Sequence, residues 1–223
     1  MFRDRQDAGR RLAAELLKYK DENPIVVAVP RGGVPVGAEI ARELRAPLDI
    51  VVVRKLGAPG QPELGIGGVS DGDQPRTIVN EELARMLGVS EEYLLREIRL
   101  QLKEVDRRQK VYRSGRPALN LSGRTVIVAD DGIATGGSIR AALRGIRRAN
   151  PKRLVLAVPV APIDAIEALR SEADDVVCLD ARVSFGGVGE FYRDFRQASD
   201  EDVIRLLEKA RAQAPEGSAP QPG

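Results

Sequence analysis

The sequence predicts an α/β fold in which helices flank an open parallel sheet. Short runs of apolar, often β-branched residues alternate with amphipathic stretches, as expected for buried parallel strands that are covered by helices. The chain has 223 residues, of which 43% are hydrophobic and 30% are charged, and this is enough for one substantial core. We therefore expect a single domain over residues 1–211.

Apolar runs and amphipathic stretches give the predicted elements in order. The strands are Ile25–Val29, Leu48–Val53, Thr125–Ala129, Leu154–Val160 and Val176–Leu179. The helices are Asp4–Tyr19, Val34–Leu44, Gly137–Ala149, Ile163–Arg170 and Asp200–Ala210. Local chemistry supports two of these boundaries. Ser199 is a good N-cap for the helix Asp200–Ala210, and Pro151 would end the helix Gly137–Ala149.

Two regions interrupt this alternation and form a predicted insert over about residues 56–116. Gly57–Asp73 is rich in Gly, Pro and Asp and should be a mobile loop or a loose hairpin. Glu81–Arg113 has a helical pattern with one apolar face and many basic residues. That helix could bind RNA, but we favour a solvated face whose basic residues are balanced by neighbouring acids. The tail, residues 212–223, has few apolar residues and is expected to be disordered.

Composition excludes several classes of protein. The chain has no histidine, so Ser-His-Asp and Cys-His nucleophile systems and His/Cys zinc sites are ruled out. The single cysteine, Cys178, cannot form an internal disulfide and suits a reducing compartment. Apolar stretches are far shorter than the ~20 residues that cross a bilayer, and the charged N-terminus lacks the apolar core of an export signal. We therefore expect a cytoplasmic protein without a membrane partner; the formal net charge of +2 gives no support for a nucleic-acid partner.

The segment Val126–Ser138 (VIVADDGIATGGS) is the most informative part of the chain. A glycine-rich turn at a helix start points backbone N–H groups and the positive end of the helix dipole at a phosphate. The adjacent acids Asp130 and Asp131 would repel a phosphate, but they suit the hydroxyls of a cis-diol or a magnesium ion. A ribose 5-phosphate carries both kinds of group. The chain has no Walker A sequence and no G-x-G-x-x-G after a strand.

Other loops should meet this segment, because ligands of open parallel sheets bind beyond the carboxyl ends of the strands. After the first strand, two glycines allow the backbone to approach an anion and Arg31 can give it a forked contact. Arg54 and Lys55 follow the second strand and precede the glycine-rich region. Aromatic residues make up only 4% of the chain yet cluster between Phe185 and Phe195, where they could stack on a flat base or simply form core.

The segment Val126–Ser138 closely resembles the phosphoribosyl-pyrophosphate (PRPP) loop of type I phosphoribosyltransferases: an apolar strand, two acids, two spacers, Thr-Gly, a small residue and Ser or Thr. The resemblance implies that Asp130 and Asp131 bind the ribose diol, and that the family's Mg²⁺ and dimeric state carry over. It also implies that the 5-phosphate is bound by Ala134, Thr135, Gly136, Gly137 and Ser138.

Three further segments resemble parts of the same enzymes. Pro30-Arg31-Gly32-Gly33 is similar to the pyrophosphate loop, which carries a cis peptide that would here join Pro30 to Arg31. Arg54 and Lys55 resemble the basic start of the catalytic loop, with Leu56–Asp73 as a lid. Residues 180–198 resemble the hood of hypoxanthine-guanine phosphoribosyltransferases. That likeness implies magnesium binding by Asp180, pyrophosphate binding by Arg193, and base contacts by Phe185, Phe191 and Tyr192.

One departure from the purine enzymes concerns the acceptor. Those enzymes carry a lysine near the end of the strand before the hood, whereas Val158–Pro162 contains none. Guanine and hypoxanthine are therefore not the expected acceptors.

Our main hypothesis is a phosphoribosyltransferase that moves the 5-phosphoribosyl group from Mg-PRPP to a nitrogen acceptor. In that hypothesis Asp130, Asp131, Arg31 and Lys55 are the catalytic residues. The alternatives are a PRPP-binding regulator without transferase activity and a magnesium-dependent phosphate-ester hydrolase.

Overall fold

The computed structural model describes residues 1–71 and 76–213 and contains a five-stranded, entirely parallel sheet. The strand order is β2-β1-β6-β7-β8. Its strands are β1 (Ile25–Ala28), β2 (Leu48–Ile50), β6 (Thr125–Ala129), β7 (Arg153–Pro162) and β8 (Asp175–Arg182). The prediction of an open parallel sheet flanked by helices is confirmed.

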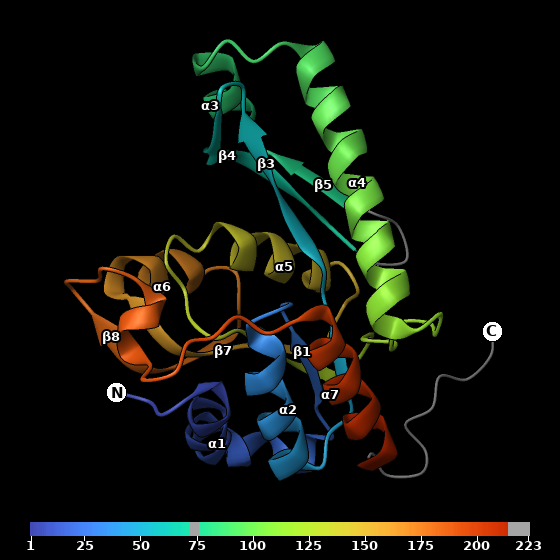
Figure 1. Cartoon of the computed structure of the whole chain (residues 1–223), viewed down its shortest axis with the longest axis vertical. Helices are drawn as coiled ribbons and strands as arrows, with labels where there is room; N and C mark the ends of the chain where they lie inside the picture. The colour runs from blue at the N-terminus through green and yellow to red at the C-terminus, as the bar shows by residue number, and fades with distance from the viewer. Residues whose placement is uncertain (72–75, 214–223) are drawn as a thin grey trace.

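Helices cover both faces of this sheet (Figure 1). On one face lie α1 (Arg5–Leu16), α2 (Gly33–Leu44) and α7 (Asp200–Gln213); on the other lie α5 (Gly137–Arg147) and α6 (Ile163–Leu169). A 3-10 helix, η1 (Leu17–Glu22), extends α1. Alternate strand residues face the two layers: Val26 and Ala28 pack in the α1/α2 core, whereas Ile25 and Val27 pack in the α5/α6 core.

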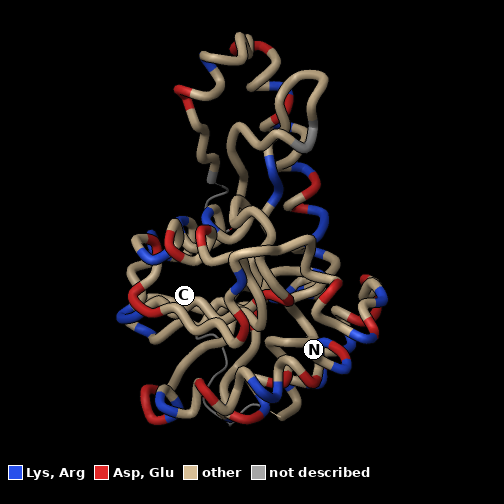
Figure 2. The backbone as a smooth tube through the Cα atoms, turned by 90° about the vertical axis from the view of Figure 1, so that its left-hand side faces the viewer, with Lys and Arg blue, Asp and Glu red and all other residues tan. Residues whose placement is uncertain are grey.

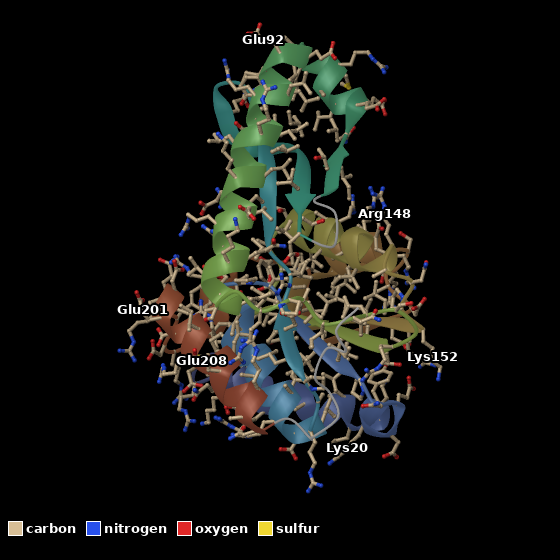
Figure 3. All side chains as sticks on the ribbon, turned by 90° about the vertical axis from the view of Figure 1, so that its right-hand side faces the viewer. Lys20, Glu92, Arg148, Lys152, Glu201 and Glu208 are labelled. Carbon is tan, nitrogen blue, oxygen red and sulfur yellow. The ribbon has the colours of Figure 1, made fainter. Side chains whose placement is uncertain are left out.

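A second body rises from one end of the sheet (Figure 1). It consists of β3 (Val53–Ala58), β4 (Gln61–Ser70), β5 (Arg76–Val79), α3 (Glu81–Met86) and α4 (Glu91–Arg113). The strands form an antiparallel sheet in the order β3-β4-β5, and α4 lies along it with side chains filling the space between (Figure 3). Asn80 and Ser90 cap the two helices by accepting from the backbone N–H groups of Leu83 and Tyr93.

The predicted strand Leu48–Val53 is wrong in its extent. The parallel pairing ends at Ile50, and the chain then turns away from the sheet. Val52 N instead donates to Asp71 Oδ1 at 3.0 Å, and Asp71 N donates to Val52 O at 2.9 Å. One apolar run thus supplies two sheets, and periodicity alone cannot show where the first sheet ends.

The remaining predictions about the insert and the tail are resolved in part. Of the two alternatives for Gly57–Asp73, the hairpin is confirmed over the described residues, since β3 and β4 pair; residues 72–75 lie outside the described part. The predicted start of the disordered tail, at residue 212, is too early, because α7 continues through Gln213. Residues 214–223 lie outside the described part.

A buried ionic cluster joins the insert to the sheet. The Arg113 side chain, at the end of α4, contacts Asp49 Oδ1 at 3.0 Å and Asp71 Oδ2 at 3.1 Å, and it donates to Ile50 O at 2.7 Å. Burial raises the pKa of Asp71, against the attraction of Arg113. Asp49 and Ile50 lie in β2, where the chain leaves the sheet, and Arg113 lies at the end of α4, where it returns; Arg113 therefore helps to fix the position of the insert on the sheet.

Charges of both signs are interspersed along the molecule, including α4 (Figure 2). On that helix Glu104 binds Arg107 and Arg108, and Lys110 binds Asp106. This pairing agrees with the solvated face predicted for the basic helix. Within residues 1–71 and 76–213, no helix combines the length and apolar character needed to cross a membrane.

Candidate functional site

Two loops meet where β1 and β6 end at the carboxyl edge of the sheet. Val29 N donates to Ala129 O at 2.9 Å. A Cβ atom added to Gly32 would lie 2.1 Å from Asp131 Oδ2, and one added to Gly33 would lie 2.6 Å from Ala129 O. Only glycine allows this approach, so the predicted meeting of the two loops is confirmed. The peptide bond between Pro30 and Arg31 is cis, also as predicted.

The two acids of the predicted PRPP loop occupy different environments. Asp130 Oδ1 accepts from Asp131 N at 2.8 Å. Burial, and then the charge of Asp131, raises the pKa of Asp130 well above its ordinary value. The carboxylate of Asp131 forms an ion pair with Arg5, with Nε and Oδ2 2.7 Å apart. The carbonyl of Asp131 accepts from the Tyr192 hydroxyl at 2.6 Å.

The turn that follows these acids opens to solvent at the start of α5. Gly136 is the N-cap residue with φ +77°, a conformation that favours glycine. The turn is lined by Ala134, Thr135, Gly137 and Ser138, and all four residues are exposed. The first N–H groups of a helix lack intrahelical partners, and the helix dipole adds positive potential there. The turn therefore has the chemistry of a phosphate site.

Arg31 reaches toward the insert and the C-terminal helix. Its Nη1 lies 3.5 Å from Asp200 Oδ1, and the Tyr112 hydroxyl donates to the same oxygen at 2.7 Å. Burial and Asp200 raise the pKa of Tyr112 to about 12. One carboxylate thus links the predicted pyrophosphate loop with α4 and α7.

The positions predicted for Arg54 and Lys55 are wrong. Both lie inside β3 instead of in a loop after the second parallel strand, because that strand ends at Ile50. Arg54 Nε donates to Gln101 Oε1 of α4 at 3.0 Å, and the stem of Lys55 packs over Gly65 of β4. The segment after them is a paired hairpin.

The predicted hood surrounds a short 3-10 helix, η2 (Val188–Phe191), and reaches the acidic loop. Val188 packs so closely on Gly132 that an added Cβ there would lie 2.6 Å from Val188 Cγ1. The rings of Phe185 and Phe191 stack with centroids 5.1 Å apart.

Tyr192 does not fit its predicted contact with a base. It is only 6% exposed, and its ring packs against Phe2 and Phe195 with centroids 5.5 and 5.1 Å away. Its hydroxyl donates to the Asp131 carbonyl, so Tyr192 stabilises the backbone of the acidic loop.

The residues predicted for magnesium and pyrophosphate in the hood differ in their contacts: Asp180 has a side-chain partner, whereas Arg193 makes its contact with Phe2 through its backbone. Asp180 accepts two hydrogen bonds from Arg182, at 2.5 and 2.9 Å. Arg193 is exposed, and its backbone N donates to Phe2 O at 2.9 Å. No group of three His, Cys, Asp or Glu side chains that could hold a metal occurs in the described part of the chain.

Sequence reasoning missed three residues that contact the site: Arg5, Tyr112 and Asp200. Arg5 lies in a stretch that also contains Arg3, Arg10 and Arg11, and no local pattern separates it from them. Asp200 looks like an ordinary acid in the first turn of a helix. Tyr112 looks like one of the apolar positions of α4. Only the tertiary arrangement brings these side chains to the two loops.

Comparisons with known proteins agree with this geometry. The family model for the phosphoribosyl transferase domain matches residues 3–195. Rv0571c of Mycobacterium tuberculosis H37Rv and MT0597 of strain CDC 1551, both provisionally named phosphoribosyl transferases, are each 41% identical over 219 residues, 98% of this chain. The match covers 49% of those proteins, so the chain spans about half the length of these curated relatives.

A solved structure extends the likeness to the fold. The crystal structure of TT1426 from Thermus thermophilus is 42% identical, with a TM-score of 0.81, and the match covers 94% of this chain and 98% of that one. With the family model spanning both loops of the site, the chain belongs to the phosphoribosyl transferase domain family.

Proposed function

We propose that the chain transfers the 5-phosphoribosyl group of Mg-PRPP to a nitrogen acceptor and releases pyrophosphate. The observation that carries this proposal is the contact of Gly32 with Asp131 at the carboxyl edge of the sheet. It sets a loop suited to pyrophosphate beside one suited to a pentose phosphate. PRPP carries these groups on the same ring, so one molecule could occupy both loops.

The turn Ala134–Ser138 would hold the 5-phosphate through backbone N–H groups and the hydroxyls of Thr135 and Ser138. This phosphate lies away from the carbon that reacts. Its binding energy would therefore orient the sugar without taking part in bond cleavage.

The bond between C1 and pyrophosphate would break ahead of attack, which leaves positive charge on the sugar ring. Asp130 and Asp131 would bind the 2- and 3-hydroxyls, and their negative field would favour that charge. Arg31 would bind the departing pyrophosphate with a guanidinium whose Nη1 lies 3.5 Å from Asp200 Oδ1. Arg193 would add positive charge, and Pro30, Gly32 and Gly33 would complete the pyrophosphate site.

Mg²⁺ would enter as part of the substrate. No three-ligand metal group occurs in residues 1–71 and 76–213, which fits a cation whose ligands come mainly from pyrophosphate, the sugar and water. Asp130, Asp131 and Asp180 are the side chains that would contact its water shell. The bound cation would neutralise charge on the leaving group.

The stacked pair Phe185 and Phe191 would offer a flat surface to the acceptor. A planar nitrogen heterocycle suits such a surface. The missing lysine in β7 argues against a 6-oxopurine, so the acceptor panel must extend to pyrimidines and amines.

Pyrophosphate release from PRPP, assayed with Mg²⁺ across such a panel, tests the proposal. Asp130→Asn and Asp131→Asn should each lower turnover by about two to three orders of magnitude, because each removes a charge that stabilises the transition state. Asp164→Asn, a change in the first turn of α6, is the control and should leave turnover unchanged.

Other outcomes would support other functions. Binding of Mg-PRPP without pyrophosphate release by any acceptor would support the regulatory alternative. Release of inorganic phosphate would support a hydrolase. Unchanged turnover in both aspartate variants would refute the roles given to them.

A further inference from the structure

The N-terminal segment of the chain is bound to the hood. Phe2 N donates to Phe191 O at 2.7 Å, and Phe2 O accepts from Arg193 N at 2.9 Å. The Phe2 ring is buried, with its centroid 5.5 Å from that of Tyr192. These contacts fix the chain where it enters α1, only a few residues before Arg5.

Arg5, the first residue of α1, is committed to contacts at the site. Its side chain is 10% exposed. Nε donates to Asp131 Oδ2 at 2.7 Å, Nη1 donates to Arg196 O at 2.7 Å, and the guanidinium carbon lies 4.0 Å from the centre of the Phe195 ring. A planar guanidinium held by a carboxylate, a carbonyl and an aromatic face has a fixed orientation.

Asp131 is restrained on several sides as a result. Arg5 holds one carboxylate oxygen, the Gly32 backbone lies against the same carboxylate, and the Tyr192 hydroxyl holds the Asp131 carbonyl. Asp130, the other acid at this point, uses Oδ1 to accept from Asp131 N. The side-chain charge that neutralises Asp131 therefore comes from a helix outside both loops.

We propose that Arg5 is a positioning residue that orients the Asp131 carboxylate toward the hydroxyls of the bound pentose. This inference rests on the proposed function, because the pentose is the ligand that Asp131 would bind. Arg5 acts through Asp131, and its guanidinium remains in contact with Phe195 and Arg196. A lysine would keep the charge but lose the planar guanidinium, which donates to Asp131 through Nε and to Arg196 O through Nη1 at the same time.

Calorimetric titration of the full chain with Mg-PRPP, and separately with Mg-pyrophosphate, tests this role. Arg5→Gln should weaken Mg-PRPP binding by about tenfold to a hundredfold, since a small misplacement of a binding group has effects of that order. Arg5→Lys should fall between Arg5→Gln and the wild type. Arg11→Gln is the matched control on α1, because Arg11 is 55% exposed and pairs with Asp7; it should leave binding unchanged.

Mg-pyrophosphate separates positioning from loss of structure. It lacks the pentose hydroxyls, so Arg5→Gln should bind it within about twofold of the wild type. Equal weakening for both ligands would mean that the variant has lost its structure at the site, and would overturn the proposal. So would Mg-PRPP binding by Arg5→Gln within about twofold of the wild type.

A double-mutant cycle assigns the effect to Asp131. In an Asp131→Asn background, Arg5→Gln should weaken Mg-PRPP binding by no more than about twofold. Full additivity of the two losses would show that Arg5 does not act through Asp131.

A wild-type protein that fails to bind Mg-PRPP would refute the proposed function. The four proteins of the cycle (the wild type, the two single variants and the double variant) would then be compared by urea unfolding. Coupling of about tenfold in the unfolding equilibrium constant would retain the Arg5–Asp131 link, and additive effects would refute it.

Discussion

Gly32 and Asp131 show, at the scale of single residues, how the site depends on close contact between two loops. Gly32 has φ −62°, which any residue can adopt, so its backbone conformation does not require glycine. Space requires it, since an added Cβ would lie 2.1 Å from Asp131 Oδ2. The sequence predicted that this glycine lets the backbone approach an anion, and the structure shows that the neighbour it admits is the carboxylate of Asp131.

Replacing this glycine should move the acid while leaving the fold in place. We expect Gly32→Ala to weaken Mg-PRPP binding by about tenfold to a hundredfold, because the Asp131 carboxylate must rotate away from the new methyl group. Calorimetry gives the affinity, and circular dichroism checks the fold. Gly187→Ala is the control: Gly187 has an extended backbone and nothing within 4 Å of an added Cβ. Wild-type affinity in Gly32→Ala would contradict the predicted role of this contact.

Adjacent acids can also differ in ways that only the folded chain reveals. Asp130 and Asp131 are equivalent in the sequence, but burial and its neighbour's charge raise the pKa of Asp130, whereas Arg5 pairs with Asp131. The two acids after β6 could therefore be identified from the sequence, but their distinct environments could not.

At the scale of elements, the insert is attached to the sheet through a few buried polar contacts. The Arg113 side chain joins the end of α4 to Asp49, which lies in β2, and to Asp71, which follows β4. All three are buried, with Arg113 at 7% exposure. Buried charges of this kind are favourable only while each has its partner.

Removing the cation should therefore be costly. We expect Arg113→Met to lower the free energy of unfolding by about 3–5 kcal/mol, since two buried carboxylates lose their partner. Urea unfolding measures the loss. Arg107→Met on the exposed side of the same helix should change stability by about 0.5 kcal/mol or less. Equal effects of the two changes would show that the buried cluster does not anchor the insert.

Glu104, on helix α4, should make a pH-dependent contribution to the free energy of unfolding. Hydrogen bonds from Arg107 and Arg108 lower the pKa of Glu104 from 4.5 to about 2. A lowered pKa means stabilisation that is present above the unfolded-state value and is lost as the pH falls toward about 2.

Glu104→Gln tests this contribution. It should reduce the free energy of unfolding at neutral pH by about 0.5–1 kcal/mol, a modest value because the pair is partly exposed. The difference from the wild type should shrink as the pH falls below 4.5. Urea unfolding at several pH values measures it, and added salt should reduce it because exposed charges are screened. A difference that stays constant with pH and salt would contradict the ionic explanation.

At the scale of the whole molecule, the resemblance to type I phosphoribosyltransferases predicts that two copies of the chain associate as a homodimer. Sedimentation equilibrium should then give a mass of about twice the 24.2 kDa of one chain. A mass of 24.2 kDa at micromolar concentration would contradict the prediction.

Local patterns were enough to predict the parallel sheet, its helices and the two loops at its carboxyl edge. Apolar periodicity follows from burial of strand and helix faces, and the glycines, acids and small residues of Val126–Ser138 carry their chemistry within one short segment. The cis bond at Pro30–Arg31 was likewise implied by a local motif. Each of these features depends on residues that are close together in the chain.

Only the tertiary structure decided which distant residues reach the site. Arg5 contacts an acid that is 126 positions away, and Arg31 meets Asp200 across 169 positions. The end of β2 and the pairing of β3 with β4 were likewise set by contacts with Asp71 and α4. Such contacts depend on how the elements pack in space, and the residues next to a side chain in the sequence do not predict that packing.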